Sequence, residues 1–464
     1  MSSIAPVYIP TFTSPVEAPL IATSFKEQIE LLRSRIAPRT ISKASVVILG
    51  AGPAGLLRAI EAVMHGNPVQ VIEKRSEGGN GRINTVALTE AAISKLKDFA
   101  VYQYLLENSL IDGLYKDGSI HVRLTDLELA MKEVLSRLSP DPVITYDATV
   151  TAINDQAEKI AVVIASKGEE LLIKDVDILV NTEGSRSTTN ALLGIDRIQV
   201  LPSFPVVAAI YRDIRPKITG AISAAKYVGR SMGDIARTIY YQVQLIFLFI
   251  VLKNFRRQII GAVTLSTPKQ AYLGGAFSDG INARILTLQG SYLEKKRALE
   301  KASTPDEIAR CKKDLKSAEA AYWKFASRWL HLSLAMANLI AILLRSESRY
   351  RPMALHRSLK KFEVVMIGAD RAAVFSKRIK GTFVLLAGDA AATVDPATGL
   401  GCNTAISTGS FFTDLLSGFE EGSIDKETLL LQYENRMAER TKSIHHESKR
   451  TRAQYRPQDV SLIG

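Results

Sequence analysis

A glycine-rich turn between a strand and a helix constrains this chain more than any other feature of its 464 residues. Residues 46–50 (VVILG) read as a buried strand, and an apolar helix separates them from a second strand at residues 68–74 (PVQVIEK). The turn holds Gly50, Gly52 and Gly55 in the pattern G-x-G-x-x-G. The first glycine allows a tight turn, the second lets a pyrophosphate approach the backbone, and the third lets helix and strand pack closely. The pattern therefore predicts a parallel α/β sheet with a phosphate-binding helix N-terminus.

An acidic residue follows where such a unit binds a ribose. Glu73 ends the second strand, eighteen residues after Gly55, and its carboxylate can accept hydrogen bonds from a ribose diol. The alternative is a tight turn that binds no ligand. Because the strand and the helix are both present, we predict that the unit binds an adenine dinucleotide. The unit alone does not distinguish FAD from NAD.

Residues 385–403 (LLAGDAAATVDPATGLGCN) combine an apolar strand with a backbone that carries few reactive side chains. Gly388 and Asp389 end the strand, and Pro396 follows after six residues. Alanine and glycine let such a backbone lie close to a flat ring, and the aspartate can bond a sugar-like chain. Between this stretch and the glycine turn, residues 177–195 (DILVNTEGSRSTTNALLGI) read as a strand that ends in a second glycine turn.

Taken together, these three segments resemble the signatures of the group A FAD-dependent monooxygenases, the family built on the para-hydroxybenzoate hydroxylase fold. The resemblance covers roughly residues 45–195 and 362–416. It implies an α/β fold, with a Rossmann-type FAD-binding domain of the GR2 class, a β-sheet substrate domain and, in this chain, an added helical hairpin.

The resemblance also implies roles for individual residues. The glycine turn and Glu73 would hold the ADP half of FAD, Arg82 would lie near the pyrophosphate, and Arg123 would contact FAD before the next helix. Asp389 would bond the ribityl chain, and the backbone of residues 396–403 would lie along the flavin ring. The expected cofactor-binding residues are Gly50, Gly52, Pro53, Ala54, Gly55, Glu73, Lys74, Arg75, Arg82, Arg123, Gly388, Asp389, Pro396, Gly399, Leu400, Gly401 and Asn403.

The second family motif, Asp-Gly-x-x-Ser-x-x-Arg, is altered here. Its aspartate is lengthened to Glu183 and its closing arginine is Asn190. In the family this motif serves both FAD and the pyridine nucleotide. The changes therefore bear more on the NAD(P)H interaction than on FAD.

The activity implied by the resemblance is hydroxylation of an organic substrate through a flavin C4a-hydroperoxide, with NAD(P)H as electron donor. No catalytic side chain is required, because the cofactor carries the chemistry, and no histidine cluster has metal-ligand spacing. Two alternatives stay open: a flavin-dependent reductase of isoprenoid-type double bonds, and a non-catalytic FAD-binding interaction protein. The related halogenases are disfavoured, because their Trp-x-Trp-x-Ile-Pro motif has no match.

A net charge of +12 and a pI near 9.4 favour acidic partners. The EKR…GRINTVAL segment also resembles the actin-oxidising MICAL monooxygenases, so an acidic protein substrate is an alternative to the small-molecule substrate that we expect. We predict no nucleic-acid partner and no integral membrane segment, with peripheral membrane contact by residues 329–344 as an alternative. Two distant cysteines and no secretory signal predict a cytoplasmic protein.

Along the chain we expect a helix at residues 25–36, another at 126–138 with Thr125 and Glu128 as a capping box, and a strand at 143–154. The middle reads as strands, the last at residues 283–289 (ARILTLQ), before a helical block that stops and restarts at residues 303–307. A helix is expected at 404–416. The predicted domains are an N-terminal extension (1–40), a first FAD-binding part (41–195), a substrate domain (196–375) with its helical block (292–344), a second FAD-binding part (376–420) and a C-terminal basic segment (421–464).

Overall fold

The computed structural model describes residues 24–36, 43–78, 85–114, 118–139, 143–155, 158–212, 259–266, 270–277, 279–343, 359–421 and 425–455. These residues fall into two compact units. The larger is drawn mainly from residues 14–202 and 368–453, and the smaller mainly from residues 203–367.

A six-stranded sheet forms the centre of the larger unit. Its strand order is β15-β16-β10-β1-β2-β6, and neighbouring strands are parallel except for β15 with β16. The segments that follow β1, β2, β10 and β16 therefore leave the same edge of the sheet. The strand bounds are β1 Val46–Leu49, β2 Val69–Ile72, β6 Ile144–Thr145, β10 Ile178–Asn181, β15 Ser376–Ile379 and β16 Thr382–Leu386.

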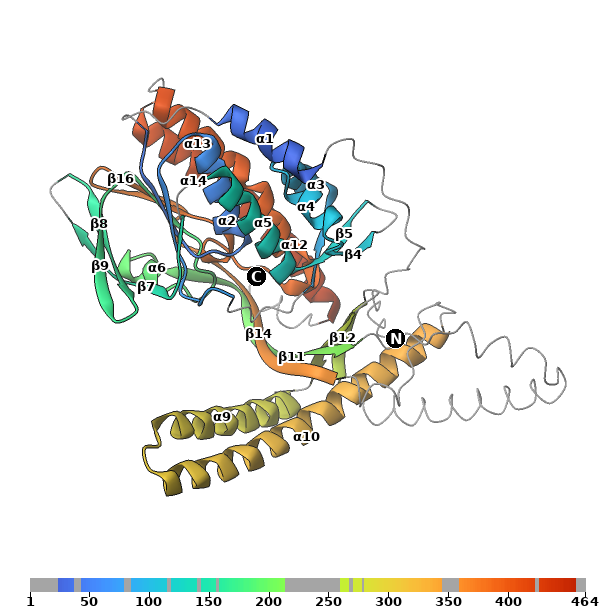
Figure 1. Cartoon of the computed structure of the whole chain (residues 1–464). Coiled ribbons are helices and arrows are strands. Elements are labelled where there is room, and N and C mark those ends of the chain that lie inside the picture. Colours follow the sequence, from blue (N-terminus) through green and yellow to red (C-terminus); the bar gives the residue numbers. More distant parts are fainter. Residues whose placement is uncertain are drawn as a thin grey trace. The chain divides into compact units, whose positions relative to one another are not determined.

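Helices pack on this sheet and on one another (Figure 1). The helix after β1, α2, contacts α5, α12 and α13. The predicted N-terminal helix is α1, which has a Ser24–Glu27 capping box and buries Ile29 and Leu32 in the core. The bounds are α1 Phe25–Arg35, α2 Pro53–Met64, α3 Glu90–Asp98, α4 Val101–Glu107, α5 Leu124–Leu138, α6 Thr188–Leu192, α12 Leu400–Ser407, α13 Gly409–Glu421 and α14 Lys426–Tyr455, with short 3-10 turns at η1 Gly388–Ala390 and η2 Pro396–Thr398.

Two smaller antiparallel sheets complete this unit. In the first, of order β3-β5-β4, Thr85 of β3 lies opposite Arg123 of β5. The second has the order β7-β8-β9. The bounds are β3 Thr85–Leu88, β4 Ile111–Leu114, β5 Ile120–Arg123, β7 Ala148–Asp155, β8 Ile160–Ser166 and β9 Glu169–Val176.

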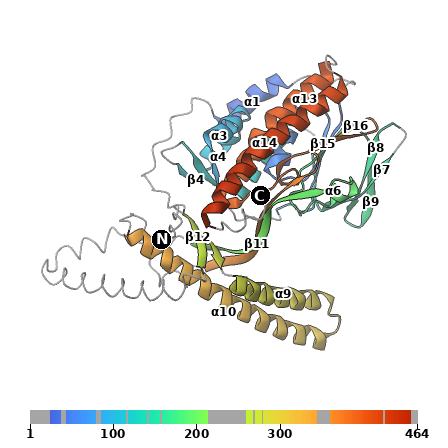
Figure 2. The ribbon, with the colours of Figure 1, turned by 180° about the vertical axis from the view of Figure 1, so that it is seen from behind.

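The smaller unit combines a four-stranded sheet with a hairpin of two long helices (Figures 1 and 2). The predicted restart is confirmed, because Thr304 Oγ1 accepts from Glu307 N and Glu307 Oε2 accepts from Thr304 N, each at 3.3 Å. The rings of Tyr292 and Tyr322 stack across the hairpin, 6.1 Å apart. The sheet order is β12-β13-β11-β14, with bounds β11 Arg197–Arg212, β12 Ile259–Ser266, β13 Gln270–Phe277 and β14 Leu359–Ala372, and the helices are α9 Asp279–Lys301 and α10 Pro305–Leu343.

Several local predictions were wrong. Residues 283–289 belong to helix α9 rather than to a strand, because no break separates this short apolar run from the helical sequence after it. The cap of α5 is Arg123, which makes no side-chain cap bond, so Thr125 and Glu128 form no capping box. The strand expected at 143–154 breaks before β7, where Asp147 has a φ of +54°.

The C-terminal part of the chain is more regular than its polar sequence indicated. The helix expected at 404–416 begins at Leu400 and is divided at Thr408 into α12 and α13. The basic segment after it contains the 30-residue helix α14. This helix buries Tyr433, Met437 and Ile444, so it is part of the core.

Some predictions concern positions outside the described residues: those for residues 1–23 of the N-terminal extension, for Arg82 and for the side chains of residues 329–344. Among the helices that are described, none has the length and apolar character needed to span a bilayer.

Candidate functional site

The glycine turn after β1 is built by close contacts that leave no room for side chains. Gly50 has a φ of +100°, and a Cβ on it would lie 2.8 Å from the carbonyl oxygen of Thr182. A Cβ on Gly55 would lie 1.9 Å from Gly50 O and 2.6 Å from Thr182 Oγ1. The Thr182 hydroxyl donates to Leu49 O and Gly50 O, at 2.7 and 2.9 Å, which fixes the turn against the end of β10.

Helix α2 begins directly on this turn. Gly52 is its N-cap and supplies no capping side chain, and Pro53, its first residue, has no backbone N–H. The N–H groups in the first turn of an α-helix lack intrahelical partners and carry partial positive charge. The arrangement fits a phosphate at the N-terminus of α2.

Glu73, at the end of β2, is buried against the same turn. Its Oε2 accepts from Ala51 N at 2.7 Å and from Arg75 Nη2 at 2.9 Å, and its Oε1 accepts from Arg75 N and Nε at 2.9 and 3.0 Å. Burial alone would raise the pKa of Glu73, but the bonds from Arg75 and Ala51 outweigh it and lower the pKa. The carboxylate therefore stays ionised beside the glycine turn.

Arg75 links Glu73 to a second buried carboxylate that sequence reasoning assigned to a helix cap. Arg75 Nη1 lies 3.1 Å from Glu128 Oε2, on α5. A carboxylate offers about four lone-pair sites, and those of Glu73 already meet four N–H groups. A ribose diol can bond Glu73 only where Arg75 gives up one of its bonds. Lys74, by contrast, is exposed.

The first and third motifs touch, although more than 300 residues separate them. Ala387 N donates to Asn181 O at 3.0 Å as β16 ends beside β10. The next residue, Gly388, has a φ of +59°, and a Cβ on it would lie 2.9 Å from the Cβ of Ala54. The carboxylate of Asp389 follows at once and is exposed. A side chain larger than hydrogen at position 388 would separate the segment that carries Asp389 from the N-terminus of α2.

The altered second motif is used to hold the third. Glu183 Oε2 accepts from Ser187 Oγ at 2.7 Å and from Thr189 N at 3.3 Å, so it closes the turn before α6. Asn190 Nδ2 donates to Ala390 O at 3.1 Å, and Arg197 Nη1 donates to the same oxygen at 2.8 Å. Both residues that depart from the family pattern thus make bonds inside the protein.

The segment after Asp389 turns into helix α12. Gly399, with a φ of +65°, is the N-cap of this helix. Asn403 is buried: its Nδ2 donates to Ala87 O at 2.8 Å and to Gly399 O at 2.9 Å, and its Oδ1 accepts from Thr89 N at 2.9 Å. The asparagine therefore ties α12 to the end of β3. Gly401 is less restricted, because a Cβ there would lie 3.5 Å from Val394, an ordinary contact.

Arg123 lies at the end of β5, opposite Thr85 of β3. Its Nε is 2.8 Å from Asp126 Oδ2, in the first turn of α5. The predicted contact of Arg123 with FAD stays a prediction.

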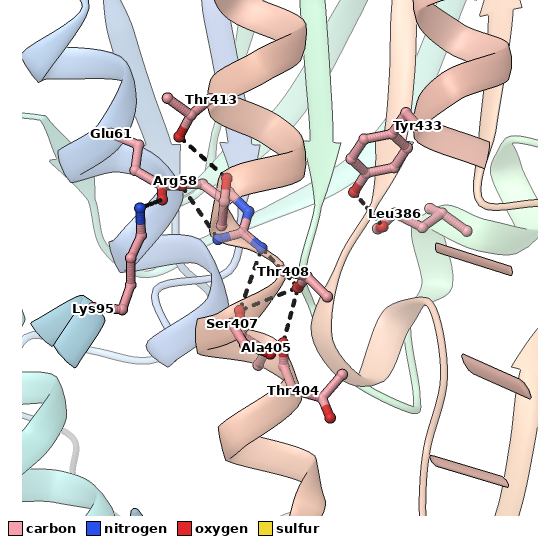
Figure 3. A network of polar contacts seen from close by, with 11 residues as sticks. Arg58, Glu61, Lys95, Leu386, Thr404, Ala405, Ser407, Thr408, Thr413 and Tyr433 are labelled. Carbon is pink, nitrogen blue, oxygen red and sulfur yellow. Dashed lines mark hydrogen bonds and ion pairs between the residues drawn. The ribbon is translucent and has the colours of Figure 1, made fainter. Parts of the chain in front are cut away.

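A buried polar network joins the two helices that begin at the candidate site (Figure 3). Arg58, on α2, is fully buried and its Nη2 donates to Thr408 Oγ1 at 3.0 Å and to Ala405 O at 3.3 Å, where α12 ends. Glu61 pairs with Arg58 at 3.3 Å and with Lys95, on α3, at 3.2 Å. The network fixes α2 against the C-terminal end of α12. Sequence reasoning missed it, because an arginine in an apolar helix gives no local sign of its partner.

Two comparisons with known proteins bear on this arrangement. Residues 353–448 match the family model described as "FAD binding domain", a range that includes the third motif. The crystal structure of p-nitrophenol 4-monooxygenase from Pseudomonas putida DLL-E4 is similar to this chain, with a TM-score of 0.54 and 15% identity, over 91% of this chain and 93% of that one. The fold is that of the group A flavin monooxygenases.

Other structures with this fold carry different activities. A ternary complex of aklavinone-11 hydroxylase with FAD and aklavinone has a TM-score of 0.56 and 15% identity, over 90% of this chain and 70% of that one. The flavin-dependent halogenase CmlS has a TM-score of 0.56 and 12% identity, over 88% of this chain and 64% of that one. No curated protein sequence matches the chain. The predicted fold class is thus confirmed, whereas a shared fold does not choose between hydroxylation and halogenation.

Proposed function

We propose that this chain is an FAD-dependent monooxygenase that takes electrons from NAD(P)H and hydroxylates a small organic substrate. The observation that carries the proposal is the convergence of three motifs at one edge of the parallel sheet. The glycine turn follows β1, Glu73 follows β2, Glu183 follows β10 and Asp389 follows β16. Ligands of doubly wound sheets bind at such carboxyl ends.

The residues fit FAD in chemical type. The glycine turn admits a pyrophosphate at the N-terminus of α2, and Glu73 would bond the ribose once Arg75 exchanges a bond. The exposed carboxylate of Asp389 would accept hydrogen bonds from the ribityl hydroxyls. The N-terminus of α12, at Gly399, would place its partial positive charge at the ring.

When bound, reduced flavin supplies the chemistry: with two electrons from NAD(P)H and one dioxygen, one oxygen atom enters the substrate and the other leaves as water. The protein would bind and orient the ring and keep water away from it. Backbone N–H groups at the start of α12 would stabilise negative charge that develops on the ring. No side chain is needed as nucleophile or base under this scheme.

The test is purification of the chain, a visible spectrum, and NADH and NADPH oxidation with a panel of aromatic and polycyclic substrates. We expect bound FAD, substrate-stimulated oxygen consumption and a product heavier by one oxygen atom. Protein that stays colourless and takes up no added FAD would refute the proposal. A variant with Gly55→Leu is the negative control, because its side chain cannot fit against Gly50 O.

The other activities give different results in the same assay. A reductase of isoprenoid-type double bonds would consume NAD(P)H and substrate without oxygen. A halogenase would require halide. A non-catalytic FAD-binding protein would keep its flavin oxidised with every ligand. An acidic protein substrate would stimulate NAD(P)H oxidation where the small molecules do not.

A further inference from the structure

The C-terminal helix α14 turns one face toward the loop that leads into α12. His445, Ser448 and Arg452 are spaced i, i+3 and i+7, so they share a side of the helix. All three are buried, although they belong to a segment rich in lysine and arginine. Figure 2 shows α14 as a long helix in the orange-red to red colours of the C-terminal part of the chain.

These three side chains bond two residues of the loop that precedes Pro396. Arg452 Nε donates to Asp395 Oδ2 at 2.7 Å, and both side chains are fully buried. Asp395 N donates to Ser448 Oγ at 3.3 Å, and His445 Nε2 donates to Thr393 O at 2.9 Å. Arg452 Nη1 also donates to Pro202 O at 3.1 Å, so the guanidinium is held from two sides.

Hydrogen bonds also connect Asp395 to Leu400, the first residue of α12. The carbonyl oxygen of Asp395 accepts from Thr398 N at 3.0 Å and from Thr398 Oγ1 at 2.7 Å. The same Thr398 hydroxyl accepts from Leu400 N at 3.2 Å. A continuous chain of bonds therefore runs from Arg452 through Asp395 and Thr398 to the N-terminus of α12.

We propose that Arg452 and Ser448 are positioning residues. From the C-terminal helix α14 they hold the backbone of residues 395–400 in the conformation that accommodates the flavin ring. The proposal rests on the proposed function, since the ring is expected along this backbone. A role in stability alone is a poor account of the pair, because buried ion pairs stabilise little compared with apolar residues of the same size. The hydrogen bonds of the Arg452–Asp395 pair do fix the path of the loop backbone, whereas apolar packing at the same place would constrain it less.

The experiment compares three variants with the wild-type chain. Asp395→Asn with Arg452→Gln removes both charges together and so avoids an unpaired buried charge. Ser448→Ala removes the bond from Asp395 N, together with the bond that the Ser448 hydroxyl donates to Ile444 O within α14, and leaves the Arg452–Asp395 pair in place. Arg450→Met is the matched control, because Arg450 lies two residues from Arg452 on the same helix, is exposed and pairs only with Glu447 among its described contacts.

Four properties are measured: amide hydrogen exchange of residues 388–403 without FAD, the FAD dissociation constant, and the visible spectrum and the reduction potential of bound FAD. We expect the double variant to exchange faster in this segment, to bind FAD about tenfold more weakly and to shift the spectrum and potential. Ser448→Ala should show the same changes on a smaller scale. If the double variant fails to fold, the Ser448→Ala result alone tests the positioning role. Arg450→Met should stay within about twofold of wild type in affinity.

A folded double variant with the exchange, affinity and spectrum of Arg450→Met would overturn the positioning role. Failure of the proposed function is seen separately, because the wild-type chain itself would then bind no FAD. Even if the chain binds no FAD, hydrogen exchange still tests whether Arg452 and Ser448 hold the loop. Unchanged exchange of residues 388–403 in the double variant and in Ser448→Ala would overturn that role without any flavin present.

Discussion

Replacing Gly388 by alanine tests the contact that joins the first and third motifs. Gly388 has a φ of +59°, and a Cβ on it would lie 2.9 Å from the Cβ of Ala54 and 4.0 Å from that of Ala405. An L-residue in this conformation costs about 1–2 kcal/mol, and an extra methyl in a packed site costs a further ~1–3 kcal/mol. We therefore expect Gly388→Ala to lower the free energy of unfolding by about 2–5 kcal/mol. FAD binding should weaken with it, because Asp389 is the next residue.

Ala54→Gly separates the two costs, because it removes the methyl that the new Cβ would meet. Alone it should destabilise the chain by about 0.5–1 kcal/mol, since glycine is unfavourable inside a helix. Combined with Gly388→Ala it should recover about 1–3 kcal/mol, so that only the backbone strain at position 388 and the cost of glycine at position 54 remain. Urea unfolding followed by far-ultraviolet circular dichroism gives the free energies of all four forms, and quenching of FAD fluorescence gives their affinities.

Additive losses in this cycle would refute the reasoning. A coupling energy below about 0.5 kcal/mol would mean that Gly388 and Ala54 are not in contact, and the two motifs would then not share a site. A Gly388→Ala variant as stable as the wild-type chain would refute the backbone argument as well.

Three further predictions test neighbouring parts of the larger unit. Gly401→Ala should keep or raise stability, because the new Cβ lies within a helix and meets Val394 at an ordinary 3.5 Å. It should nevertheless weaken FAD binding if the ring lies on this backbone. Urea unfolding measures the first effect and FAD titration the second. Glu73→Gln should weaken FAD binding by about one to two orders of magnitude, because bonds to a charged acceptor are worth about 1.5–3 kcal/mol; unchanged affinity in the same titration would contradict this. Burial lowers the pKa of His445 below its ordinary value of 6.5, and it outweighs Thr393 and Asp370, which raise the pKa, while Arg371 lowers it further. Below about pH 6.5 the unfolded chain then binds more protons than the folded chain, so stability should decrease as the pH is lowered. Thermal unfolding of His445→Gln should lose this part of the pH dependence.

The sequence was sufficient for features that depend on neighbouring residues. The strand–turn–helix at Gly50 and the stop and restart of the helical hairpin at Thr304 follow from spacing and capping chemistry within a few residues. The same kind of reasoning failed at residues 283–289, where a run of seven residues fits a strand or a helix equally and only its flanks decide. It failed again at Glu128, whose spacing from Thr125 suggested a cap.

Partners that are distant in sequence could not be predicted. Glu128 bonds Arg75, 53 residues away, and Arg452 bonds Asp395, 57 residues away, and in neither case does the sequence around one residue indicate the other. Arg58 is a third case, because its acceptors at Ala405 and Thr408 lie about 350 residues further along the chain. Buried charge is costly unless paired, so each of these residues requires a partner, but the fold alone determines which.

The third motif is thus held by its surroundings at several points. Gly388 packs on Ala54, Asp395 is bonded by Arg452, and Asn403 is bonded to the end of β3. A site that contacts a flat ring mainly through backbone has few side chains whose removal would abolish binding, so its precision must come from such anchors. Under the proposed function, loss of the Asp389 carboxylate would remove one group expected to face the cofactor, whereas loss of an anchor would displace several backbone groups together. We therefore expect Asp389→Ala to bind FAD more tightly than Gly388→Ala, and the opposite order in the same fluorescence titration would show that side-chain contacts dominate this site.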